Sequence, residues 1–142
     1  DLILYWYNFF LSSLVLSTDN AVNMNDDGYL TLSEISNLEL DANFINLSAC
    51  KTARGEMYAL EGVDGFIQSF FNAGAQSILS ALWSIEDESA KIFMENLYKN
   101  YKSTKSFSHA INSSKLSFIN GDFGDRYKNP FFWSPYVYFY RK

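Results

Sequence analysis

The sequence predicts an α/β fold in which a mostly parallel central sheet is flanked by helices. Two apolar segments, 44–48 and 77–82, read as strands, and a helical pattern over 63–73 separates them. A second helical pattern, over 87–101, follows the second strand. Strands that alternate with helices in this way are typical of a parallel sheet covered by helices. The length of 142 residues and the 48% apolar content suit a hydrophobic core, so we expect residues 1–142 to form a single domain.

Local signals place the elements in the first half of the chain. The apolar segments 2–7 and 14–16 are expected to form strands. Thr31 and Glu34 match a capping box, in which each residue's side chain accepts a hydrogen bond from the other's backbone amide. A short helix is therefore expected to run from this box to about Leu40. The apolar residues of its buried face would be Leu32, Ile35 and Leu38.

Similar signals define the second half. Gly74 is expected to end the helix over 63–73, because glycine readily adopts the left-handed conformation found after helix C-termini. The helix over 87–101 begins with acidic residues, which the positive end of a helix dipole favours. Another helix is expected over 106–119, and the apolar tail 136–140 reads as the last strand.

Composition and charge argue against several classes of protein. The net charge is −5 and no block of like charges occurs, so we expect no nucleic-acid partner. The longest apolar runs, 1–16 and 131–140, are interrupted and too short to span a bilayer, so we expect no membrane partner. The single cysteine rules out a disulfide within the chain and favours a reducing, cytoplasmic compartment. The first residue is Asp1 rather than Met, which indicates a processed fragment or a domain that lacks its N-terminal portion.

Cys50 stands just beyond the carboxyl end of the expected strand 44–48. In open α/β sheets, ligands bind outside the carboxyl ends of the strands. A cysteine becomes a nucleophile when a base, a positive charge or a helix N-terminus favours its thiolate. On position alone, a buried and inert cysteine is equally compatible with the sequence.

The surrounding segments strengthen the nucleophile interpretation. In order along the chain, the most informative are LSACKTA at 47–53, FFNAGA at 70–75, SALWSIED at 80–87 and NPFFWSPYV at 129–137. Shorter pieces at 11–16, 27–31, 55–56 and 61–63 fit the same order. Together they resemble the CHAT domain, a relative of caspases and separases that often accompanies tetratricopeptide repeats.

The resemblance implies a caspase-like sandwich and a cysteine endopeptidase that uses a Cys-His dyad and needs no cofactor. Cys50 takes the position of the nucleophile, and its backbone amide is a candidate donor to the oxyanion. The resemblance also implies that Ser48, Trp83 and Asp87 bind substrate. The expected partners are a protein or peptide substrate and tetratricopeptide repeats or another protein module.

Asp87 has a more specific role in this resemblance. In separases, an aspartate in a similar Trp-x-x-x-Asp turn lines the pocket for a basic side chain, and Asp87 follows Trp83 by four residues. A carboxylate can pair with an arginine in a fork geometry. The competing interpretation is that the acidic residues of this turn, 86–88, only cap the helix that follows.

The dyad histidine is missing where the resemblance would place it. In the family it precedes a glycine, at the end of the strand before the segment 11–16. The matching region 2–8 contains neither residue, so either the chain starts after the dyad histidine or that position is substituted. The glycine amide that would complete the oxyanion hole is missing with it. The only histidine, His109, falls in the expected helix 106–119, and we do not expect it to be the base.

Two alternatives therefore stay open. The first is an inactive CHAT-like module that serves as a binding or scaffold domain, because a cysteine without a base has little thiolate at neutral pH. The second is a calcium-binding module, since residues 23–34 nearly fit an EF-hand loop, with Gly28 at position 6 and Glu34 at position 12. Asn23 at position 1 and the strand-like residues before the loop count against calcium.

Overall fold

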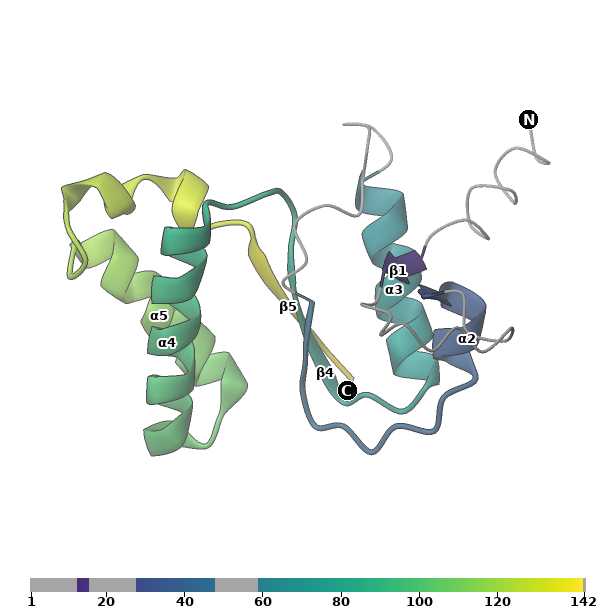
Figure 1. Ribbon diagram of the computed structural model, residues 1–142. Coiled ribbons are helices and arrows are strands. Elements are labelled where there is room, and N and C mark those ends of the chain that lie inside the picture. The colour runs from purple at the N-terminus through teal and green to yellow at the C-terminus, as the bar shows by residue number, and fades with distance from the viewer. Residues whose placement is uncertain (1–12, 16–27, 48–58, 142) are drawn as a thin grey trace. The chain divides into compact units, whose positions relative to one another are not determined.

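The computed structural model describes three stretches of the chain, which are residues 13–15, 28–47 and 59–141 (Figure 1). The chain divides into two compact units. The N-terminal unit contains the described residues up to Asn43, then 59–77 and Arg141. The C-terminal unit contains residues 44–47 and 78–140. Both units combine helices with strands, as the α/β prediction requires. The strand expected over 2–7 lies outside the described residues.

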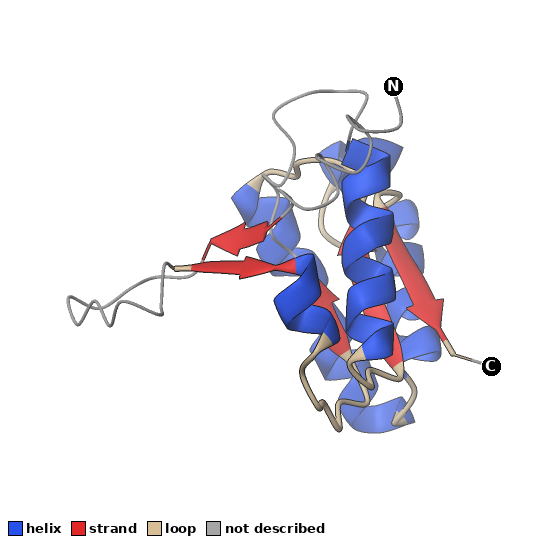
Figure 2. Cartoon of the chain, turned by 90° about the vertical axis from the view of Figure 1, so that its right-hand side faces the viewer, coloured by secondary structure: helices blue, strands red, loops and turns tan. Residues whose placement is uncertain are grey.

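The described part of the N-terminal unit contains a two-stranded sheet and two helices. β1 (Ser13–Val15) pairs antiparallel with β2 (Tyr29–Thr31) (Figure 2). α2 (Leu32–Ser36) follows β2 directly, and α3 (Ala59–Asn72) comes later in the chain. β1 confirms the strand expected over 14–16, although it begins one residue earlier and ends one residue earlier.

The capping box at the start of α2 is present as the sequence predicts. The Thr31 hydroxyl accepts from the Glu34 amide at 3.3 Å, and the Glu34 carboxylate accepts from the Thr31 amide at 2.8 Å. The helix ends at Ser36 rather than near Leu40. Because the helix stops early, Leu38 is exposed and the prediction that it lies on the buried face is wrong.

Gly74 ends α3, also as predicted. Its φ of 107° lies in the left-handed region, and its amide donates to the carbonyl of Phe71 at 3.0 Å. The amide of Leu40 donates to the carbonyl of Ala73 at 2.6 Å. This bond ties the segment after α2 to the end of α3.

The C-terminal unit contains most of a three-stranded sheet in the order β3-β4-β5. Its strands are β3 (Ile45–Leu47), β4 (Ser77–Ala81), whose first residue belongs to the N-terminal unit, and β5 (Tyr136–Tyr140). β3 and β4 are parallel, with Leu47 opposite Ser80. At the two ends of β4, the Leu82 amide donates to Pro135 and the Arg141 amide donates to Gln76, so β5 runs opposite to β4. Among the described strands of this sheet, the expected parallel pairing holds for β3 with β4 but not for β4 with β5.

Two long helices lie side by side in the C-terminal unit (Figure 1). α4 (Asp87–Thr104) starts where predicted and runs three residues further than 101, until Lys105 adopts a left-handed conformation. α5 (Phe107–Asn120) is capped by Ser106, whose hydroxyl accepts from the His109 amide. Two 3₁₀ turns that the sequence analysis did not anticipate, η1 (Asp125–Lys128) and η2 (Pro130–Phe132), lead back to β5.

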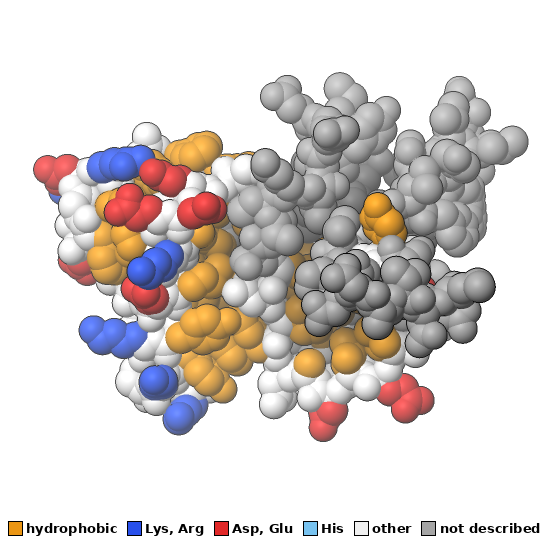
Figure 3. Space-filling view, in the orientation of Figure 1, with side chains coloured by type: hydrophobic (Ala, Val, Ile, Leu, Met, Phe, Trp, Pro, Cys, Tyr) orange, Lys and Arg blue, Asp and Glu red, His pale blue; other side chains and the backbone are white. Residues whose placement is uncertain are grey.

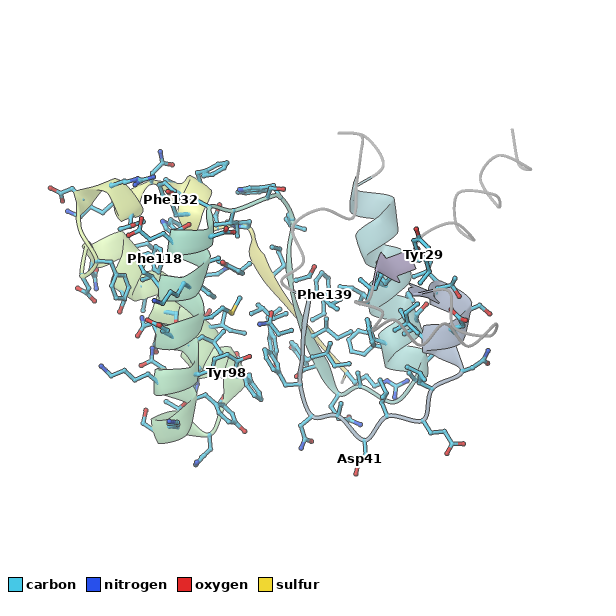
Figure 4. All side chains as sticks on the ribbon, in the orientation of Figure 1. Tyr29, Asp41, Tyr98, Phe118, Phe132 and Phe139 are labelled. Carbon is cyan, nitrogen blue, oxygen red and sulfur yellow. The ribbon has the colours of Figure 1, made fainter. Side chains whose placement is uncertain are left out.

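Aromatic rings join these helices to the sheet. Phe93 of α4 is fully buried and stacks on Tyr136 of β5, with ring centroids 3.8 Å apart. Phe118 of α5 lies 5.8 Å from Phe93 and reaches toward α4 (Figure 4). Phe44, which precedes β3, stacks on Phe107 at the start of α5 at 3.8 Å. No helix in the described stretches is long and apolar enough to cross a membrane.

Candidate active site

The parallel pairing of β3 and β4 brings their carboxyl ends to the same edge of the sheet. β3 ends at Leu47, three residues before Cys50. Ser48 and Cys50 lie outside the described residues. β4 ends at Ala81 and leads through a short turn into α4. This turn contains Trp83 and Asp87 follows it as the first residue of α4, so the structure places two of the expected site residues at this edge.

Trp83 lies on the surface, where the η2 turn holds it. Its indole N–H donates to the carbonyl of Phe131 at 3.1 Å. The two rings lie 6.1 Å apart, tilted by 31°. Trp83 is 39% exposed and Phe131 is 48% exposed. The site therefore presents two aromatic rings to solvent beside the start of α4.

The acidic residues at the start of α4 have different surroundings. Glu86 pairs with Arg126 at 2.6 Å, and this bond raises the pKa of the guanidinium above its ordinary value. Burial and, after it, the Glu88 carboxylate raise the pKa of the Tyr127 hydroxyl. Asp87 is exposed, and no residue in the described part of the chain forms a hydrogen bond or an ion pair with its carboxylate.

Helix capping does not account for Asp87. The N-cap position belongs to Glu86, whose side chain makes no capping bond. The buried Ser89 hydroxyl donates to the Glu86 carbonyl at 2.9 Å and so does not reach Asp87 either. Among the described residues, none occupies the Asp87 carboxylate, which is therefore available to a ligand.

Charge is distributed along α4 by sign. Acidic side chains of the C-terminal unit lie mainly toward the start of α4 and basic ones toward its end (Figure 3). The first turn carries Asp87 and Glu88, and the last turn carries Lys102. This arrangement complements the helix dipole.

His109 lies far from this edge. α4 has 18 residues and is therefore about 27 Å long. Asp87 begins it, whereas His109 lies on the first turn of α5, just after α4 ends. Phe107, two residues before His109, stacks on Phe44 at the amino end of β3. Both relations place His109 away from the carboxyl end of β3, as the sequence analysis expected.

The structure also bears on the EF-hand interpretation. Glu34, which would be the last ligand of the loop, accepts from both the amide and the hydroxyl of Thr31 at 2.8 Å. The described residues before the loop form strand β1 rather than a helix. Residues 23–27 lie outside the described residues. In the stretches that are described, no three His, Cys, Asp or Glu residues gather as metal ligands would.

Comparison with known proteins identifies the family. The CHAT domain model matches residues 9–141. The chain belongs to the CHAT domain family. Among curated proteins, mouse tetratricopeptide repeat protein 28 is 28% identical over 110 residues, which cover 66% of this chain and 4% of that protein. The chain thus spans a small fraction of this relative's length. No solved structure matches the chain.

The sequence did not reveal two residues that contribute to the candidate site. Arg126 is 40 positions from Glu86, and nothing local in the sequence indicates that the two residues pair. Phe131 belongs to the C-terminal segment that supported the family resemblance, but its carbonyl contact with Trp83 depends on the η2 turn.

Proposed function

We propose that this CHAT domain is the cysteine-bearing part of a caspase-like cysteine endopeptidase, with Cys50 as its nucleophile. The observation that carries the proposal is the parallel β3–β4 pair in a chain of this family. Cys50 follows one strand, and the exposed Trp83 and Asp87 follow the other. The single family match includes residues of both units, which supports one CHAT domain.

The strand register supports a shared site. Leu47 is opposite Ser80, and neighbouring strands lie about 4.8 Å apart. Cys50 is three residues beyond Leu47, and Trp83 is three residues beyond Ser80. Three residues span at most about 10 Å. The chain connections thus keep Cys50 within reach of the edge that carries Trp83.

The proposed reaction is peptide hydrolysis in two steps. The Cys50 thiolate attacks the carbonyl carbon of the substrate, and the amine leaves with a proton, which yields a thioester. Water then attacks the thioester and restores the thiol, releasing the carboxylic acid. A histidine acts first as acid to the leaving amine and then as base to the water. Because His109 lies at the far end of α4, we assign this role to a histidine elsewhere in the natural protein.

The specificity that we propose is for a basic side chain. A guanidinium can pair with the Asp87 carboxylate and stack on an aromatic ring such as Trp83. Ser48 would line the same site from the end of β3. The relative's name also supports an association of this domain with tetratricopeptide repeats in its natural protein.

The alternative function is binding without catalysis. It is favoured by one observation, which is the distance of the only histidine from the candidate site. Loss of a general base typically reduces the rate by about 10²–10⁴-fold. Loss of one oxyanion donor reduces it by about 10²–10³-fold. A form of the protein that lacks both groups would act as a scaffold.

Proteolysis by two forms of the protein tests these functions. The 142-residue chain should cleave no member of a peptide library, whereas the natural protein should cleave peptides and lose this activity in Cys50→Ala. If Cys50→Ala leaves cleavage by the natural protein unchanged, the peptidase proposal is wrong. Proteolysis by the 142-residue chain that depends on both Cys50 and His109 would show that the base is misassigned.

A further inference from the structure

We propose that Arg126 is a positioning residue that holds the Trp83–Asp87 turn in place and thereby sets the selectivity of the site for a basic side chain. This inference rests on the proposed function, since it concerns the same site. Arg126 itself need not touch the substrate. It links the turn after β4 to the aromatic segment that precedes β5.

The contacts of the Arg126 guanidinium reach both segments at once. One nitrogen, Nη2, donates to the Glu86 carboxylate at 2.6 Å. The guanidinium carbon lies 5.6 Å from the centre of the Tyr127 ring and 5.5 Å from that of Phe132. Phe132 lies beside the start of α4 (Figure 4). A planar guanidinium suits this combination of a charged hydrogen bond with contacts to two rings.

Two further bonds join the same segments, one from Trp83 itself and one from Leu82 just before it. The Trp83 indole N–H donates to the Phe131 carbonyl at 3.1 Å. The Leu82 amide donates to the Pro135 carbonyl at 3.0 Å. The Phe131 and Phe132 rings are in edge contact, with centroids 5.6 Å apart. The Arg126 contacts therefore act on the segment that supports the Trp83 ring.

The ion pair also separates the roles of neighbouring carboxylates. Glu86 is paired with Arg126, whereas the described residues offer no partner to Asp87. Without Arg126, Glu86 would be a second available carboxylate beside Asp87. The site would then discriminate less between cations of different geometry. Arg126 thus engages Glu86 and leaves the neighbouring Asp87 carboxylate without a partner among the described residues.

The test uses variants that conserve net charge. Glu86→Gln with Arg126→Gln removes the pair but leaves the total charge unchanged, so a change in binding reports geometry rather than long-range attraction. The matched control is Lys91→Gln with Glu95→Gln, which removes an exposed ion pair from the same helix. Melting temperatures of all variants of the full chain identify any that fail to fold.

The measurement follows the indole N–H resonance of Trp83 in ¹H–¹⁵N spectra, assigned with Trp83→Phe. Two blocked tripeptides, one ending in arginine and one in glutamine, are titrated into each variant. We expect the arginine peptide to shift the resonance and the charge-conserving double variant to bind it about tenfold more weakly, an effect of the size seen within coupled networks. Arg126→Lys should be intermediate, because lysine keeps the charge but not the planar contacts.

The outcomes separate two failures. If the double variant folds and binds the arginine peptide as wild type does, the positioning role of Arg126 is wrong. If wild type itself binds neither peptide, the proposed basic specificity is wrong. The positioning role of Arg126 is then tested on the Trp83 resonance of the unliganded protein. In that case, an unchanged Trp83 resonance in the double variant overturns the positioning role, and a displaced resonance supports it.

Discussion

Replacing Gly74 by alanine should destabilise the protein more than the same replacement at Gly124. Both glycines have a left-handed backbone, with φ of 107° and 111°, so alanine at either position carries a strain of about 1–3 kcal/mol. Their surroundings differ. A Cβ on Gly74 would overlap the Leu40 carbonyl oxygen and come within 3.3 Å of its carbon, whereas a Cβ on Gly124 would meet no atom within 4 Å.

The overlap at Gly74 is costly because the backbone around Leu40 is anchored. The Leu40 amide donates to the Ala73 carbonyl at 2.6 Å, and the Gln76 amide donates to the Ala42 carbonyl at 2.9 Å. Forcing an extra group into such a packed place typically costs about 1–3 kcal/mol. Added to the shared strain, this predicts a loss of about 2–6 kcal/mol for Gly74→Ala and about 1–3 kcal/mol for Gly124→Ala.

Urea unfolding of the full chain, followed by circular dichroism, measures both losses through the unfolding midpoint and slope. Gly124→Ala serves as the control for backbone strain alone. Equal losses in the two variants would refute the argument that the Leu40 carbonyl requires glycine at position 74.

Three other predictions concern the core, the pocket and calcium. Phe93→Ala should lower the free energy of unfolding by about 3–5 kcal/mol, because it leaves a cavity beside Tyr136; a loss under about 1 kcal/mol in urea unfolding would contradict this packing. Asp87→Ala in the natural protein should abolish cleavage after arginine and lysine in a peptide library, while Glu95→Ala, an exposed change on the same helix, should not; retained basic specificity in Asp87→Ala would refute the pocket. Calorimetric titration of the chain should show no micromolar calcium binding, because Glu34 is engaged with Thr31; binding heat that disappears in Glu34→Gln would overturn this.

The sequence predicts best where structure depends on neighbours in the chain. The capping box of Thr31 and Glu34 and the glycine at the end of α3 are local patterns, and the structure confirms both. The exposure of Leu38 was not predictable from apolar spacing, because the spacing continues past the end of α2 at Ser36.

Features that depend on distant residues were not predictable in the same way. β2 (Tyr29–Thr31) exists as a strand through its pairing with β1, whereas its own residues indicated only the helix cap at Thr31. The direction of β5 relative to β4 depends on the path through η1 and η2. At the candidate site, the position of Asp87 followed from the strand–helix pattern, but the partner of Glu86 did not.

Covalent labelling of the natural protein tests the central claim, that Cys50 is the nucleophile of a peptidase. The reagent is a peptidyl chloromethyl ketone that ends in arginine, and mass spectrometry locates the adduct. We predict a single adduct on Cys50 that forms faster than with the glutamine-ending analogue. Modification of another residue, or labelling of Cys50 no faster than that of a free thiol, would contradict the claim.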